Sequence, residues 1–168
     1  MSAIPTPQTK PEMQRPGDLG FDPFETGILS VTRHLLVSFR SPETQTWHIA
    51  YSIAAERWGD NIGFPAAHRL AKYLKAVLRS RTDSIDFNDP FCVESRDWVT
   101  QDEAALLYVL HFMRRDDTPA ARDAVETLTL GRMDPDVIRT GLDFAQRFPS
   151  GATPAPQHRT KPVLYVVS

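Results

Sequence analysis

One stretch of this chain concentrates side chains that could bind phosphate. Residues 64–81 hold five positive charges and no negative charge. Most of these bases recur three or four residues apart, so they share one face of a helix, and His68 lies on the same face. A basic helix face is the kind of surface that can hold a nucleic-acid backbone. The candidate nucleic-acid contacts are Arg69, Lys72, Lys75 and Arg79.

The stretch that follows offers a competing explanation for these bases. Residues 82–103 hold seven acidic residues against a single arginine, Arg96. Adjacent segments of opposite charge can fold back and pair, although an exposed pair contributes less than about 1 kcal/mol. On this interpretation the basic face is a solvated surface that is paired within the chain. The sequence leaves open whether the face is free or paired with residues 82–103.

Catalytic and metal-binding signatures are missing from the sequence. It contains no GxGxxG, GxxxxGK[ST] or GxSxG motif, and no two histidines four residues apart around a carboxylate. His111 lies in an apolar run, so its ring is expected to be buried and to need a polar partner. A structural role explains this histidine better than a catalytic one. A small enzyme built on His111 with Tyr108 or Glu103 is a third hypothesis without a motif. We therefore expect no cofactor and no metal site, and the sequence favours a protein that is not an enzyme.

The elements that must position these residues are helices. Four helix starts are marked by an oxygen-bearing residue followed by proline, which combines an N-cap with a favoured first residue. The pairs are Asp22-Pro23, Ser41-Pro42, Thr118-Pro119 and Asp134-Pro135. A fifth start carries a capping box at Thr100 and Glu103. Together with the spacing of apolar residues, these signals predict six helices. They span residues 23–39, 43–59, 66–81, 100–113, 119–130 and 135–148.

These elements predict an all-α fold, a single-domain bundle of about six helices. Within it, four aromatic residues are interpreted as core or interface residues: Trp47, Tyr51, Trp58 and Trp98. Residues 1–21 are expected to form an extended N-terminal arm, residues 22–149 the helical domain, and residues 150–168 an extended C-terminal tail. Both tails are rich in proline and poor in core residues. Between the third and fourth helices, residues 82–98 break the helical period, and residues 84–94 within them form either a small β-hairpin or an ordered loop.

Composition excludes further classes of protein. The net charge of −2 excludes a globally basic protein, and Cys92, the only cysteine, permits no internal disulfide. Its apolar neighbours Phe91 and Val93 predict a raised pKa for the thiol and little reactivity. The first residues do not resemble a secretion signal and no apolar run approaches membrane-spanning length, so we expect a cytoplasmic protein that does not enter a membrane. The chain nevertheless ends in an apolar, β-prone run, which is a candidate partner-binding segment. Its residues are Val163, Leu164, Tyr165 and Val166.

These features favour a helical binding or regulatory protein that docks on another protein through its tails and helical surface. The alternative is a DNA-binding regulator that uses the basic face of the third helix. A glycine turn before that helix gives the outline of a helix-turn-helix, although the expected connection, Gly59 to Phe64, is longer than the usual three or four residues. The identity of the partner and the oligomeric state, including self-association, are left open by the sequence.

Overall fold

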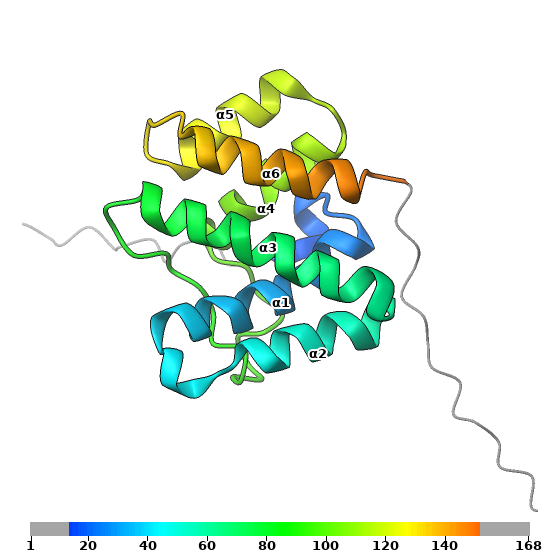
Figure 1. The fold of residues 1–168 in the computed structure, drawn as a ribbon. Helices are drawn as coiled ribbons and strands as arrows, with labels where there is room; N and C mark the ends of the chain where they lie inside the picture. Colours follow the sequence, from blue (N-terminus) through cyan, green and yellow to red (C-terminus); the bar gives the residue numbers. More distant parts are fainter. Residues whose placement is uncertain (1–13, 152–168) are drawn as a thin grey trace, which may run out of the picture.

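The computed structural model describes residues 14–151. Within this range the chain forms six α-helices and two short 3-10 helices, with no β-strand, which confirms the all-α prediction (Figure 1). The α-helices are α1 (Pro23–Arg40), α2 (Trp47–Trp58), α3 (Asp60–Ser80), α4 (Gln101–Arg114), α5 (Thr118–Leu128) and α6 (Pro135–Arg147). The 3-10 helices are η1 (Pro16–Leu19) and η2 (Pro42–Thr44).

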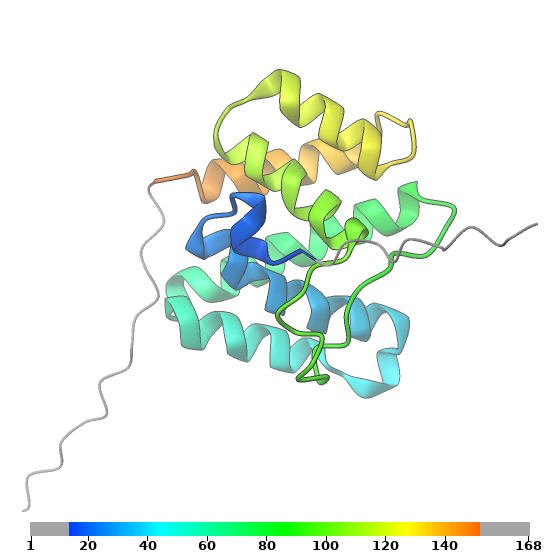
Figure 2. The ribbon, with the colours of Figure 1, turned by 180° about the vertical axis from the view of Figure 1, so that it is seen from behind.

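The helices are arranged on two sides of a shared core. Figure 1 views the side formed by α6, α3 and α2, and Figure 2 views the opposite side, where α5, α4, α1 and the 81–100 loop lie in front. Sequence neighbours pack most closely, as in α2 with α3 and α4 with α5, while α3 with α6 and α4 with α6 join distant parts of the chain. The result is a helical bundle in which every helix buries one apolar face.

Tyr73 anchors the middle of this core. Its side chain is fully buried, and its hydroxyl donates a hydrogen bond of 3.0 Å to the carbonyl oxygen of Leu106, which ties α3 to α4. Burial raises the pKa of the Tyr73 phenol above its usual value because the charged form would have no water around it. A buried phenol with a hydrogen-bond partner is the stable arrangement for tyrosine in a core.

Three of the predicted helix starts are confirmed, and the first two carry capping boxes. Asp22 accepts a hydrogen bond of 2.8 Å from the backbone N–H of Glu25 at the start of α1. Thr100 accepts one of 3.1 Å from Glu103 at the start of α4. Asp134 likewise caps α6 in front of Pro135, so local sequence decides these three boundaries.

Three other predicted starts are wrong. Pro42 begins the short η2 rather than α2, and α5 is capped by Asp117, one residue before the predicted cap at Thr118. The start of α3 moves furthest, because the helix begins at Asp60 and contains Pro65 in its second turn. Proline there removes one backbone hydrogen bond and its ring crowds the preceding turn. Packing of α3 against α2 outweighs that cost.

The β-hairpin considered at residues 84–94 is not confirmed. Residues 81–100 form a loop with turns and contain no strand. The one β-type pairing in this loop is an isolated bridge, in which the backbone N–H of Val99 donates a hydrogen bond of 2.8 Å to the carbonyl oxygen of Gln14.

Gln14 belongs to the segment predicted as an arm. Within residues 14–21, η1 forms and Phe21 is buried, its ring 4.9 Å from that of Tyr108. Residues 1–13 and 152–168, and with them the 163–166 apolar run, lie outside the described range.

Candidate functional site

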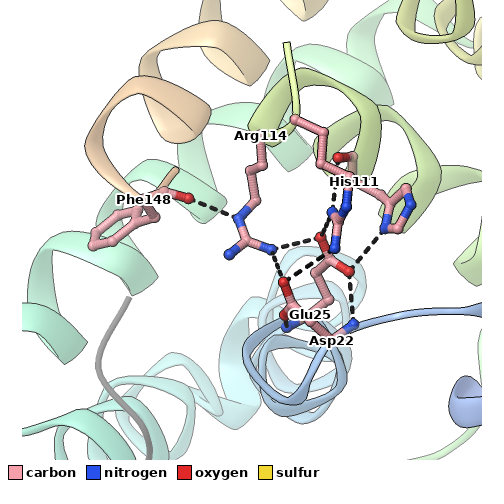
Figure 3. A network of polar contacts seen from close by, with 6 residues as sticks. Asp22, Glu25, His111, Arg114 and Phe148 are labelled. Atoms are coloured by element: carbon pink, nitrogen blue, oxygen red, sulfur yellow. Dashed lines mark hydrogen bonds and ion pairs between the residues drawn. The ribbon is translucent and has the colours of Figure 1, made fainter. Parts of the chain in front are cut away.

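A buried ionic network joins the start of α1 to the end of α4 (Figure 3). Glu25 has no exposed surface, and each of its carboxylate oxygens accepts two hydrogen bonds. Oε2 accepts 2.9 Å bonds from His111 Nδ1 and the Asp22 backbone N–H, and Oε1 accepts bonds from Arg114 at 2.5 Å and Arg115 at 2.6 Å. Every lone pair of this carboxylate is therefore used by the protein itself.

The same contacts fix the charge of the network. Burial alone would raise the pKa of Glu25, but the hydrogen bonds from His111 and Arg115, the backbone N–H of Asp22 and the charge of Arg114 outweigh it and hold this pKa below its usual value. The pKa of Asp22 is lowered in the same way, with burial opposed by the Glu25 N–H and by both arginines. Both carboxyl groups are thus ionised at neutral pH and paired with cations.

A second buried ionic network pairs a glutamate of α4 with an arginine of α1, the reverse of the pairing at Glu25. Glu103, in the capping box of α4, is fully buried and binds Arg33 of α1 through bonds of 2.6 Å and 3.0 Å. Arg33 also donates to the backbone carbonyls of Arg96, at 2.6 Å, and Trp98. Each of the helices α1 and α4 therefore offers its capping-box glutamate to an arginine of the other. Two reciprocal ionic contacts hold α1 against α4, and this role accounts for both glutamates.

The hypothesis of an enzyme built on His111 gains nothing from this geometry. Glu103 lies eight residues from His111 along α4, which corresponds to about 12 Å of helix rise. His111 donates to Glu25, so it has the partner that its burial requires. Among residues 14–151 no three His, Cys, Asp or Glu side chains gather in a way that could hold a metal ion.

The predicted basic stripe is on the outer face of α3, where Lys72, Lys75 and Arg79 are exposed. Lys75 lies over the ring of Phe39, with its amino nitrogen 5.6 Å from the ring centroid. Arg69 is turned toward α6, where its Nε is 3.4 Å from a carboxylate oxygen of Asp143. Lys72 and Arg79 have no ion pair within the described part of the chain.

Pairing with the acidic stretch is confined to the end of α3. Arg81, which follows the helix, pairs with Asp83 at 2.8 Å and Asp102 at 3.1 Å. The 81–100 loop runs across the side of the molecule that faces the viewer in Figure 2, whereas α3 lies in front in Figure 1. The acidic stretch thus leaves the exposed stripe uncovered, and the predicted internal pairing holds at Arg81 but not at Lys72 or Arg79.

The helix-turn-helix outline is not reproduced. Gly59 alone connects α2 to α3, with φ of 75°, so the predicted connection from Gly59 to Phe64 is wrong. The two helices then run back along each other as an antiparallel hairpin, with Gly63 against the backbone of Ala54. A Cβ at Gly63 would lie 2.3 Å from the Ala54 carbonyl oxygen, so only glycine permits this approach. A helix-turn-helix needs a turn of three or four residues and helices that cross at a wide angle.

An aromatic row on α2 and α3 is the feature that sequence reasoning only partly anticipated. Trp47 and Phe64 are each 44% exposed, and Tyr51 lies between them with ring centroids 5.9 Å and 6.2 Å away. The sequence indicated core or interface aromatics for Trp47 and Tyr51, and assigned no role to Phe64. The row continues along α3 into the basic stripe. We call the combined surface the α2–α3 face; it comprises Trp47, Tyr51, Phe64, His68, Lys72, Lys75 and Arg79.

Cys92 departs from its predicted chemistry. Its apolar neighbours Phe91 and Val93 suggested a raised pKa, but both side chains are exposed and the thiol interacts with Ser95 instead. Hydrogen bonds from the Ser95 side chain and backbone, and from the Glu94 backbone, lower the pKa of Cys92.

Comparison with known proteins adds no further constraint: no protein-family model, curated protein or solved structure matches this chain. None of the helices in residues 14–151 combines the length and the apolar character needed to cross a membrane.

Proposed function

We propose that this protein is a non-enzymatic helical binding protein that docks on another protein through the α2–α3 face, with its tails as additional docking elements. The observation that carries the proposal is the aromatic row of Trp47, Tyr51 and Phe64, in which Trp47 and Phe64 are exposed and Tyr51 is partly buried between them. The row leads into an uncovered basic stripe. Exposed tryptophan and tyrosine are the side chains most enriched at the centres of protein interfaces.

The chemistry of the face specifies the partner. Trp47 and Phe64 would bury their exposed ring surface against apolar side chains. Lys72 and Arg79, which have no ion pair within the described range, would meet carboxylates. A partner segment that carries apolar and acidic residues side by side fits both halves of the face. Such charge complementarity mainly speeds association and selects the partner, while the aromatic contacts supply most of the affinity.

The C-terminal tail enters the proposal through its sequence. Val163, Leu164, Tyr165 and Val166 are β-prone and apolar, a composition suited to adding a strand to a partner's sheet or filling a groove. A chain shortened by residues 159–168 should keep the helical circular dichroism of the full protein and bind its partner more weakly. Equal binding by the shortened chain would exclude the tail as a docking element.

The face itself can be tested with a matched pair of double variants. Proteins captured by the tagged full chain are identified by mass spectrometry, and the purified partner is then titrated by calorimetry. W47A with F64A should weaken binding by at least about tenfold, the loss expected at an interface hot spot. L130A with L142A, two exposed apolar residues outside the face, should leave affinity unchanged. Equal affinity of both double variants and the native chain would contradict the proposal.

The second candidate function is DNA binding by α3, and the exposure of Lys72 and Arg79 favours it. A DNA duplex is titrated at two salt concentrations with the native chain and with Lys72, Lys75 and Arg79 all changed to Ala. Phosphate contacts predict binding that weakens steeply as salt rises and that the triple change abolishes. Binding that is absent at low salt, or unaltered by the triple change, would remove this candidate.

A further inference from the structure

An arginine-lined cleft opens on α1, outside the α2–α3 face. Its volume is about 630 Å³. The floor is a single face of α1, where Thr26, Leu29, Ser30 and Arg33 follow one another at helical spacing. Leu29 provides a small apolar contact, and in the described range the hydroxyls of Thr26 and Ser30 have no hydrogen-bond partner. The floor therefore offers two hydroxyl groups beside an apolar side chain.

Three further arginines form the walls, each from a different part of the chain. Arg57 comes from the last turn of α2, Arg15 precedes η1, and Arg96 belongs to the 81–100 loop. The guanidinium of Arg57 lies against α1, since a Cβ at Gly27 would be 3.2 Å from its Nη1. The fold thus brings together four arginines that are far apart in the sequence.

The charge of the cleft is unbalanced. Among residues 14–151, Asp97 is the only acidic residue that lines the cleft, and Arg96 is 3.8 Å from it, a loose contact between two exposed side chains. The charge of Arg33 is compensated by its ion pair with the buried Glu103. Four positive charges against these two negative charges leave a net charge of +2. Arg57 has no ion pair among residues 14–151, and the guanidinium of Arg15 lies over the ring of Trp98, 5.2 Å from its centroid.

We propose that this cleft binds a small organic phosphate, with Arg57 and Arg96 as its principal contacts. Guanidinium groups bind phosphate oxygens through paired charge-assisted hydrogen bonds, and the Thr26 and Ser30 hydroxyls can donate to the remaining oxygens. Leu29, Pro16 and Pro90, which also line the cleft, suit the carbon skeleton of the ligand. The volume lies within the roughly 300–1,000 Å³ that is typical of small-molecule sites.

Arg33 has a different part in this site. Its guanidinium is engaged by Glu103 and by two backbone carbonyls, so it holds the floor in place rather than contacting the phosphate. The contacts that can be removed without disturbing the fold are those of the exposed walls. This separation allows binding to be tested with variants that keep the core intact, and the inference does not depend on the docking function proposed above.

The experiment is a calorimetric titration of the full chain with inorganic phosphate, inorganic pyrophosphate, glycerol 3-phosphate and adenosine diphosphate. At least one of these probes should bind at submillimolar concentration. R57Q and R96Q should each weaken that binding by about tenfold or more, as expected for a lost charge-assisted hydrogen bond. R139Q removes an exposed arginine of α6 and should have no effect.

Two outcomes would overturn the assignment. One is the absence of binding by all four probes at millimolar concentration and low salt. The other is binding that R57Q, R96Q and R139Q weaken to the same extent, because general charge attraction would then explain it without the cleft. Circular dichroism of each variant, compared with the native chain, shows that a loss of binding is not a loss of folding.

Discussion

Replacing Glu25 by glutamine should destabilise the protein far more than the loss of a single surface charge would. The amide keeps the size of the side chain but loses the negative charge that compensates Arg114, whose side chain is 1% exposed. Arg114 would still be able to pair with Asp22 at 2.8 Å and to donate to the Phe148 carbonyl at 2.7 Å. The substitution therefore leaves a buried cation with half of its former compensation.

The magnitude follows from this burial. Breaking a buried ion pair by removing one partner costs about 3–5 kcal/mol, because the remaining charge is left unpaired in a medium of low polarity. The remaining contact with Asp22 places the expected loss for E25Q at the lower end, about 3 kcal/mol. For a domain of this size each kcal/mol lowers the melting temperature by about 3 °C, so E25Q should melt about 9 °C below the native chain.

The assay is urea unfolding followed by circular dichroism, with the melting temperature as a second measurement. D136N is the matched control: it removes the Asp136–Arg139 pair on the exposed surface of α6 and should cost less than about 1 kcal/mol. An E25Q chain that loses less than about 1 kcal/mol, or no more than D136N, would refute the reasoning. The network would then be too well hydrated to behave as a buried one.

Three further predictions concern other parts of the fold. G63A should lower the free energy of unfolding by about 1–3 kcal/mol, since its Cβ would collide with the Ala54 carbonyl, while G17A, with open space around it, should stay within about 1 kcal/mol in the same urea titration. D22N should be less stable than the native chain above about pH 4; this difference should vanish as pH falls through the lowered native pKa of Asp22, which urea titrations across about pH 2–7 measure. Y73F should cost about 1 kcal/mol, and ultraviolet titration should show that Tyr73 ionises only when the protein unfolds.

The helix starts separate local from tertiary control. The caps at Asp22, Thr100 and Asp134 were predictable because a cap and its first turn involve only residues three apart. Ser41-Pro42 carries the same local signal yet begins only η2. For α3, the sequence pointed to Pro65 as the start, but the tight turn at Gly59 and the close approach of Gly63 to α2 extend the helix back to Asp60.

The basic stripe and the arginine cleft show the same contrast between local sequence signals and tertiary packing. The basic stripe was visible in the sequence because its members share one helix, and the structure places three of its four candidates on the exposed side of α3. The arginine cleft had one local signal, the spacing of Thr26, Ser30 and Arg33, which sequence reasoning did not use. Its other arginines come from separate segments, so no spacing along the chain could have grouped them.

The sequence by itself determined that this protein is a helical bundle, where several helices begin, and that one helix carries a run of bases. These properties depend on neighbours within one or two turns, which spacing and capping record directly. Only the tertiary structure decided that Glu25 of α1 pairs with an arginine of α4 and that Glu103 of α4 pairs with an arginine of α1. It also decided that the acidic loop leaves the basic stripe uncovered, and that four arginines line one cleft on α1. Those outcomes depend on which helix faces are buried together, and burial sets the strength of every charge involved.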